Sequence, residues 1–338
     1  MFSGAVLAAK DGKPLLEGGY GWADREARIR IVPGTRFCIA SIGKLFTAVA
    51  VAQLAGEHRL SFGDRIGKYL TGFSPQMANS VSIAELLTMT SGLGDAALGT
   101  LDPPTTLGGM MKLIASEPLQ STPGTRFLYS NDGYIVLGAI IQAVTGQSYD
   151  NYLRQHIFAP AGMIHTDVTV YTPAHVPGMA HGYTLASQNG RPLPAGAPGP
   201  RQNPDLGNAA LRDGSGMPQI GNPSGGAYST VGDLLAFARA LLDHKLLRPE
   251  MTAALLAPRV NAQQPGGPPI DMYTYGFAYQ TINGVTFVGH NGGTPGYEGQ
   301  IDIYPKTGYA VVILTNQDRA LLPAIQRTEA MITASQRK

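Results

Sequence analysis

The sequence predicts an α+β fold, because strand patterns lie at both ends of the chain and helix patterns lie in the middle. The N-terminal stretch alternates as two strands joined at Asp11-Gly12, "GAVLAAKDGKPLLEGGYGWAD", and this dipeptide suits a hairpin turn. Two C-terminal stretches follow the same pattern, with turns at Asn283-Gly284 and Lys306-Thr307-Gly308: "YTYGFAYQTINGVTFVGHN" and "GYEGQIDIYPKTGYAVVILTN". We therefore expect the two ends of the chain to build an antiparallel sheet.

Helix-start signals lie between these strand patterns. Ser82, followed three residues later by Glu85, forms a capping box ahead of the apolar run "IAELLTM". Thr230 and Asp233 have the same spacing ahead of "LLAFARALL". These signals predict that the middle of the chain is mainly helical.

Together the patterns predict two domains. Residues 1–66 and 225–338 form a discontinuous α/β domain with the sheet, and residues 67–224 form a mainly helical domain inserted between them. Residues 185–222 are dense in Pro, Gly and Asn and lack apolar periodicity, so we expect a long loop there, either functional or merely solvent-exposed. A cleft between two domains is the default place for a ligand.

Composition narrows the functional classes. The chain has 338 residues, 43% of them apolar and 14% charged, which suffices for a sizeable core, and its net charge of +2 offers no basic surface for nucleic acid. The apolar runs are shorter than the roughly 20 residues that a membrane-spanning helix needs. The lone cysteine, Cys38, excludes an internal disulfide and a thiolate zinc cage. No signal peptide precedes the first strand, so we expect a cytoplasmic protein, or an exported one if a leader was removed.

The segment "FCIASIGKLFTAVAVAQLAG" contains the first candidate for chemistry. Ser41 falls in the first turn of a predicted helix, where free backbone N–H groups and the helix dipole stabilise developing negative charge. Lys44 projects from the same face, and a neutral lysine could accept the serine proton if a dry cleft lowers its pKa. The alternative is that Ser41 caps the helix and Lys44 is solvated.

Two further segments supply candidate polar groups. In "PGTRFLYSNDGYIVLG", Tyr129 could carry a proton and Asn131 could hold a substrate carbonyl; alternatively Asn131 caps a helix and Tyr129 lies at the edge of the core. In "VGHNGGTPGYEGQ", His290 lies in a glycine-rich strand where Gly292 and Gly293 let the backbone approach a ligand closely. The alternative there is a turn with an incidental histidine.

The order of these motifs, Ser-x-x-Lys, then Tyr-Ser-Asn, then His-x-Gly, resembles the serine β-lactamase and penicillin-binding-protein superfamily. Class C β-lactamases, family VIII carboxylesterases and D-aminopeptidases are the most similar in style. Other stretches of the chain resemble recurrent family segments in their usual order: "SIAELLTMTSGL", "PSGGAYSTVGDLLAFARALL" and "YGFAYQ". The resemblance covers nearly the whole chain and implies a five-stranded antiparallel sheet flanked by helices, a helical domain, and an active site at their junction.

The resemblance also implies catalytic roles. Ser41 would be the nucleophile, Lys44 and Tyr129 the proton-transfer pair, and the backbone N–H groups of Ser41 and Gly293 the oxyanion hole. Neither a metal ion nor an organic cofactor is expected for the acyl-enzyme cycle.

Substrate contacts follow from the same resemblance. Asn131, His290 and Gly292 would contact the substrate, which we expect to be a small ester, amide or lactam. β-Lactamases usually carry lysine at the position of His290, and a neutral histidine binds a carboxylate less firmly. This favours a serine hydrolase acting on small carboxylic esters.

Three alternatives remain open at this stage. A D-aminopeptidase or D,D-carboxypeptidase and a weak β-lactamase would use the same site. A binding or sensing protein would be acylated at Ser41 without turnover. The sequence predicts no oligomeric state.

Overall fold

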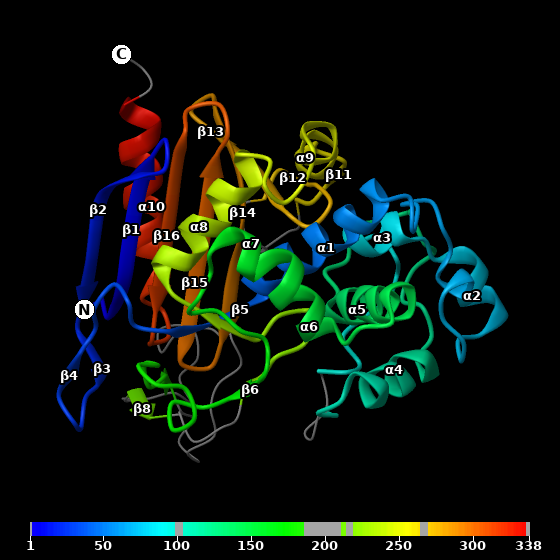
Figure 1. The fold of residues 1–338 in the computed structure, drawn as a ribbon, viewed down its shortest axis with the longest axis horizontal. Helices are drawn as coiled ribbons and strands as arrows, with labels where there is room; N and C mark the ends of the chain where they lie inside the picture. Colours follow the sequence, from blue (N-terminus) through cyan, green and yellow to red (C-terminus); the bar gives the residue numbers. More distant parts are fainter. Residues whose placement is uncertain (1, 99–103, 186–210, 214–218, 264–269, 336–338) are drawn as a thin grey trace.

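The computed structural model describes residues 2–98, 104–185, 211–213, 219–263 and 270–335. Within these residues the main feature is an antiparallel sheet of eight strands, seen on the left of Figure 1. The first and last regions of the chain meet within this sheet, since β1 pairs with β16 along its whole length. In sheet order the strands are β11 (Val260–Asn261), β12 (Met272–Tyr273), β13 (Ala278–Ile282), β14 (Val285–Thr294), β15 (Tyr297–Tyr304), β16 (Tyr309–Thr315), β1 (Gly4–Lys10) and β2 (Lys13–Tyr20).

The predicted hairpins are confirmed. Asp11-Gly12 joins β1 to β2 with both residues at positive φ, 49° and 71°, and Asn283-Gly284 joins β13 to β14 with φ of 52° and 80°. Positive φ at both central residues gives the turn a twist that matches the twist of the strands it joins.

The sheet is wider than the five strands expected. β13 pairs along the edge of β14, and the two-residue strands β12 and β11 extend the sheet further, β12 on β13 and β11 on β12. Pairing at this edge satisfies backbone N–H and C=O groups that an unpaired edge would leave exposed.

Helices cover both faces of the sheet (Figure 1). On one face α10 (Leu321–Ser335) packs on alternate residues of β16, Val311 and Ile313, in a small apolar cluster. On the other face α8 (Val231–Leu242) packs against β1 and β16, where the intervening residues Val312 and Leu314 join the main core. The period of two in a strand explains why neighbours along β16 belong to different clusters.

The helical part of the molecule lies beside the sheet, with α1 (Lys44–Gly56) running between the two parts in Figure 1. The capping box of Ser82 and Glu85 is confirmed at the start of α3, and the Thr230 side chain caps α8 by accepting from Asp233 N. The remaining helices are η1 (Ser41–Gly43), η2 (Ile66–Lys68), α2 (Pro75–Ser80), α3 (Ile83–Leu87), α4 (Leu107–Ser116), α5 (Asn131–Thr145), α6 (Tyr149–Leu153), η3 (Arg154–Phe158), α7 (Ala159–Ala161) and α9 (Pro249–Leu256).

The segment 185–222 is not a loop throughout. Its described parts include β8 (Leu211–Asp213), which pairs with β7 (Tyr183–Leu185), and β9 (Gln219–Ile220), which pairs with β6 (Val170–Tyr171). Pairing satisfies the backbone at these points, which composition alone did not reveal. Residues 186–210 and 214–218, where most of the expected loop falls, lie outside the described residues.

Short strand pairs complete the fold around the site. β5 (Phe37–Ala40) pairs with β10 (Ala227–Ser229), and β3 (Trp22–Asp24) pairs with β4 (Ile29–Arg30). Cys38 is buried in β5, as its apolar surroundings predict. In the described part of the chain, no helix is both long and apolar enough to cross a membrane.

Candidate active site

Ser41 lies at a sharp junction between β5 and the helix that follows. It opens the short helical turn η1, and the α-helix proper begins only at Lys44, so Ser41 precedes the helix in which the sequence placed it. Ala40 before it has φ 43° and ψ −129°, an uncommon conformation for a residue with a Cβ atom. Gly226 N donates to Ala40 O at 3.2 Å and holds this turn from the other side.

The glycine at position 225 is required by this turn. A Cβ atom there would lie 2.7 Å from Ala40 O and 3.1 Å from Ser41 N, and the φ of 155° also favours glycine. The "PSGG" stretch therefore packs directly on the backbone of the candidate nucleophile.

Lys44 is fully buried and its amine contacts three acceptors. Nζ lies 3.1 Å from Ser41 Oγ, 2.6 Å from Asn131 Oδ1 and 2.6 Å from the backbone carbonyl of Ser224. A neutral amine has two N–H bonds and one lone pair. If the two closer oxygens receive the N–H bonds, the lone pair is left for the Ser41 hydroxyl proton.

The protonation of Lys44 is balanced near neutrality. Burial lowers the pKa of its ammonium from 10.5 to about 7, although the negative charge of Asp95 acts in the opposite direction. At pH 7 about half of the molecules therefore hold Lys44 as a free amine. This is the state that general-base catalysis requires.

Tyr129 lies on the other side of Ser41. Its ring centroid is 4.8 Å from Lys44 Nζ, and the Ser41 hydroxyl is near enough to act on the pKa of its phenol. Burial raises the pKa of the phenol well above its ordinary value, so Tyr129 keeps its proton at neutral pH. Tyr129 is thus placed to donate or relay a proton, while Lys44 is placed to accept one.

Asn131 is held between Lys44 and Asp95. Its side-chain oxygen accepts from Lys44, and its backbone N donates to Asp95 Oδ1 at 2.6 Å. The residue that caps α5 is Ser130, whose hydroxyl accepts from Gly133 N at 2.9 Å. Among the described residues the Asn131 NH₂ group has no acceptor, which leaves it available for a substrate carbonyl.

Strand β14 passes close to the nucleophile at Gly292. A Cβ atom at this position would lie 2.1 Å from Ile39 O and 3.1 Å from Ser41 N, so no larger residue fits. Gly293 is the next residue of the strand and pairs with Glu298 of β15. The predicted oxyanion hole of Ser41 and Gly293 thus involves two neighbouring backbone segments, and it stays a prediction.

His290 is brought close to the site but does not offer it an N–H group. Its ring is 3% exposed, with Nδ1 2.5 Å from Asn291 O and Nε2 3.1 Å from the Tyr273 hydroxyl. Its centroid lies 6.3 Å from that of Tyr129. Burial, together with the positive charge of Lys44, lowers its pKa from 6.5 to about 3, so the ring is neutral at pH 7.

Three residues contribute to this arrangement without having been singled out from the sequence: Asp95, Ser224 and Tyr273. Ser224 acts through its backbone carbonyl, which no side-chain pattern can reveal, although the two glycines after it indicate a close approach. Asp95 and Tyr273 stand outside the three motifs. In the described part of the chain, no three His, Cys, Asp or Glu side chains are arranged to hold a metal ion.

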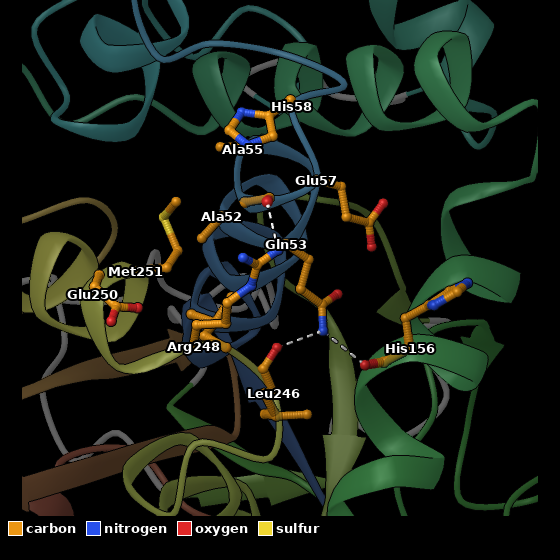
Figure 2. A pocket seen from close by; sticks show the side chains of 12 residues that line it. Ala52, Gln53, Ala55, Glu57, His58, His156, Leu246, Arg248, Glu250 and Met251 are labelled. Atoms are coloured by element: carbon orange, nitrogen blue, oxygen red, sulfur yellow. Dashed lines mark hydrogen bonds between the residues drawn. The ribbon is translucent and has the colours of Figure 1, made fainter.

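Two cavities lie in the helical part of the molecule, one beside the start of α5 and one at the end of α1. One, of about 500 Å³, is lined by Asp95, Asp132 and Glu117, beside Asn131. The other, of about 400 Å³, lies at the opposite end of α1 and is shown in Figure 2. There the Gln53 side chain donates to the carbonyls of His156 and Leu246. Because Ser41 precedes the other end of α1, the cavity in Figure 2 is separate from the catalytic residues.

A helix-flanked antiparallel sheet, with a serine and a lysine in contact at the head of a buried helix, defines the β-lactamase/transpeptidase fold. The chain matches the Beta-lactamase family over residues 1–335, and the protein belongs to this family. Protein flp of Staphylococcus aureus (strain MW2) is 28% identical to it over an alignment of 335 positions that covers 95% of this chain and 61% of flp. The chain thus spans about 61% of the length of that relative.

Solved structures share the fold. A penicillin-binding protein from Bacillus halodurans superposes with a TM-score of 0.81 at 29% identity, over 98% of this chain and 96% of that one. The D-amino acid amidase of Ochrobactrum anthropi SV3 gives a TM-score of 0.82 at 22% identity, over 98% and 94% of the two chains. EstCE1, a hydrolase with promiscuous acyltransferase activity, superposes with a TM-score of 0.74 at 21% identity, over 94% of this chain and 90% of that one. The last two show the fold alone.

Proposed function

We propose that the protein is a serine hydrolase that works through an acyl-enzyme on esters of small carboxylic acids. The observation that carries the proposal is the contact of Ser41 Oγ with a buried lysine amine whose pKa is about 7. A serine hydroxyl is a weak nucleophile unless a neighbouring base takes its proton. Membership in the β-lactamase family supports the same chemistry.

The proposed cycle uses the residues in the order of their contacts. Ser41 Oγ attacks the ester carbonyl carbon while its proton moves to Lys44 Nζ, and the backbone N–H groups of Ser41 and Gly293 bind the oxyanion. Tyr129 gives its phenolic proton to the leaving alkoxide and recovers one from Lys44, so the lysine is neutral again. Water then attacks the acyl carbon and loses a proton to Lys44; Lys44 returns this proton to the departing Ser41 Oγ, which releases the acid and restores the serine hydroxyl and the neutral amine.

The surroundings of His290 favour an ester substrate that carries no carboxylate near the scissile bond. A neutral imidazole with both nitrogens bonded to protein offers no cation and no N–H group to a substrate carboxylate. A β-lactam drug and a D,D-peptide both carry a carboxylate, whereas a simple ester does not. The esterase therefore ranks ahead of the β-lactamase and the D,D-carboxypeptidase.

A second candidate, an amidase or aminopeptidase acting on amino-acid amides, is favoured by Asp95. This exposed carboxylate contacts the backbone of Asn131 and exerts its negative charge on both Lys44 and Tyr129. A substrate ammonium group near the scissile bond would be attracted by it. The fold shared with a D-amino acid amidase agrees with this candidate.

Three substrates on one preparation test the proposal. We expect p-nitrophenyl acetate to be turned over with the highest kcat/KM, ahead of D-alanine p-nitroanilide and nitrocefin. Faster turnover of the anilide would favour the amidase, and faster turnover of nitrocefin would overturn the ester assignment. A stable penicillin adduct on Ser41 by intact mass, without product release, would instead identify a penicillin-binding sensor.

A further inference from the structure

The hydrogen bonds of His290 determine which of its nitrogens carries the proton. A backbone carbonyl can only accept, so the 2.5 Å contact between Nδ1 and Asn291 O places the proton on Nδ1. In a neutral imidazole the other nitrogen then has only a lone pair. The Tyr273 hydroxyl, 3.1 Å from Nε2, therefore donates to the histidine.

Tyr273 is held firmly in this position. It is 1% exposed in β12, and the ring of Phe127 packs on it with centroids 5.4 Å apart. Its hydroxyl also lies 3.4 Å from Gly276 O, a longer and weaker contact than the one to His290. Tyr134, buried next to it, donates its own proton to Leu87 O and so has no proton left to offer to Tyr273. A swing of Tyr273 away from His290 would open a cavity in a closely packed core.

A protonated His290 is incompatible with this arrangement. An N–H group at Nε2 would point at a hydroxyl that is already oriented to donate, and Lys44 would add a second positive charge nearby. Since both nitrogens of His290 are bonded elsewhere, its imidazole presents only carbon atoms and its π face toward Tyr129. A substrate group in this position meets an uncharged surface.

We propose that Tyr273 is a positioning residue that fixes His290 in the Nδ1-protonated form and thereby makes this subsite select substrates without a carboxylate beside the scissile bond. Tyr273 does not touch the substrate; it acts through His290. The inference rests on the proposed function, since His290 affects a reaction only if Ser41 is the nucleophile.

The substitution Tyr273→Phe tests the proposal by removing the donor while keeping the ring. Without the hydroxyl bond, Nε2 becomes more basic, and a protonated ring adds a positive charge beside the position of a substrate carboxylate. We expect the ratio of kcat/KM for nitrocefin to that for p-nitrophenyl acetate to rise at least about tenfold, because the ring charge attracts a carboxylate that only nitrocefin carries. As the pH falls from about 8 to about 5.5, this ratio of kcat/KM values should rise further in the variant and stay constant in the wild type. Because both reactions need neutral Lys44, its titration cancels in the ratio.

Tyr152→Phe is the matched control. Tyr152 is equally buried, at 2% exposure, and its hydroxyl contacts Gln53 Oε1 at 3.3 Å, at the far end of α1 near the cavity of Figure 2. The substrate ratio of this variant should equal that of the wild type. An unchanged ratio in folded Tyr273→Phe, the same as in Tyr152→Phe, would overturn the proposal.

A measurement on the wild-type protein decides the matter even if the variant fails to fold. Long-range ¹H–¹⁵N correlation spectra of the labelled protein show which imidazole nitrogen carries the proton, and His290→Asn assigns the signals. We expect His290 to remain Nδ1-protonated from about pH 8 to about pH 5.5. An Nε2-protonated form, or a titration in this range, contradicts the proposal. If instead the protein turned over no ester, the proposed function would fail and the histidine result would still stand.

Discussion

Lys44 Nζ lies 3.1 Å from Ser41 Oγ, at the closed end of a site in which the amine has no contact with solvent. The two residues lie three positions apart, Ser41 at the start of η1 and Lys44 at the start of α1, so the local backbone conformation sets their distance. The basicity of the amine is fixed by distant segments, because Asn131 and Ser224 supply its other two contacts and the surrounding core excludes water. Reactivity at Ser41 therefore depends on packing between parts of the chain that lie far apart in sequence.

The first prediction concerns the nucleophile. Ser41→Ala should lower ester turnover by at least roughly a thousandfold, because among the described residues Ser41 has the hydroxyl that contacts the Lys44 amine. A fluorophosphonate probe followed by peptide mass mapping should label Ser41 in the wild type, and Lys44→Ala should abolish the labelling. A Ser41→Ala enzyme with half of the original activity would refute the assignment.

The second prediction concerns pH. Since Lys44 must be neutral to act as base, kcat/KM should rise with pH through an apparent pKa of about 7. Asn131→Asp places a carboxylate where an amide oxygen now lies 2.6 Å from Nζ. The negative charge favours the ammonium form, so the rising limb should move upward by about one pH unit or more. A pH profile of each protein measures this shift.

Asn261→Asp is the control for that experiment. Asn261 is exposed on the short strand β11, so this substitution adds the same negative charge at a place away from Lys44. Its profile should coincide with that of the wild type. If Asn131→Asp leaves the limb in place, Lys44 is not the group that titrates.

Much of the fold could be predicted from local sequence. The hairpins at Asp11-Gly12 and Asn283-Gly284 and the capping box at Ser82 depend on a few neighbouring residues, and the structure confirms each of them. The additional strands β11 and β12 have two residues each, too short to produce an alternating pattern. Their presence depends on the free edge of β13, with which β12 pairs, and only the tertiary structure reveals that edge.

The site shows the same division. Three ordered motifs predicted which segments carry Ser41, Lys44 and Tyr129, and the structure brings these side chains into contact. The lowered pKa of Lys44 depends on the complete burial of its side chain. The spacing between Ser41 and Lys44 in the sequence cannot show whether the lysine is buried. The bond between Tyr273 and His290 joins strands that are not neighbours in the sheet, and no motif includes Tyr273.

The third prediction tests the close approach of β14 to the nucleophile. Gly292→Ala would put a Cβ atom 2.1 Å from Ile39 O, far inside van der Waals contact, so β14 and the turn at Ser41 must separate. We expect ester kcat/KM to fall at least about a hundredfold, since a misplacement of about 1 Å has that effect. Gly34→Ala is the control, because no atom lies within 4 Å of its added Cβ. Equal activity of the two variants would show that β14 does not form part of the site.

The fourth prediction concerns a carboxyl group away from the site. Asp302 on β15 is 1% exposed, and its Oδ1 accepts from Gln300 Nε2 at 2.6 Å. Burial raises the pKa of Asp302 from 3.8 to about 7, and the charge of Glu329 on α10 acts in the same direction. Between these two pH values the folded protein binds more protons than the unfolded chain, so this carboxyl lowers stability as the pH rises from about 4 to about 7.

Asp302→Asn keeps an acceptor for Gln300 and removes the buried charge. Its free energy of unfolding should therefore exceed that of the wild type by at least about 1 kcal/mol near pH 8, and should match it near pH 4, where Asp302 is already neutral. Urea unfolding at the two pH values measures both differences. Asp243→Asn, which removes an exposed carboxyl at the C-terminal end of α8, is the control for the loss of a surface charge. A loss of stability near pH 8 in Asp302→Asn would mean that the carboxylate has a stabilising partner, and the assignment of its raised pKa to burial would be wrong.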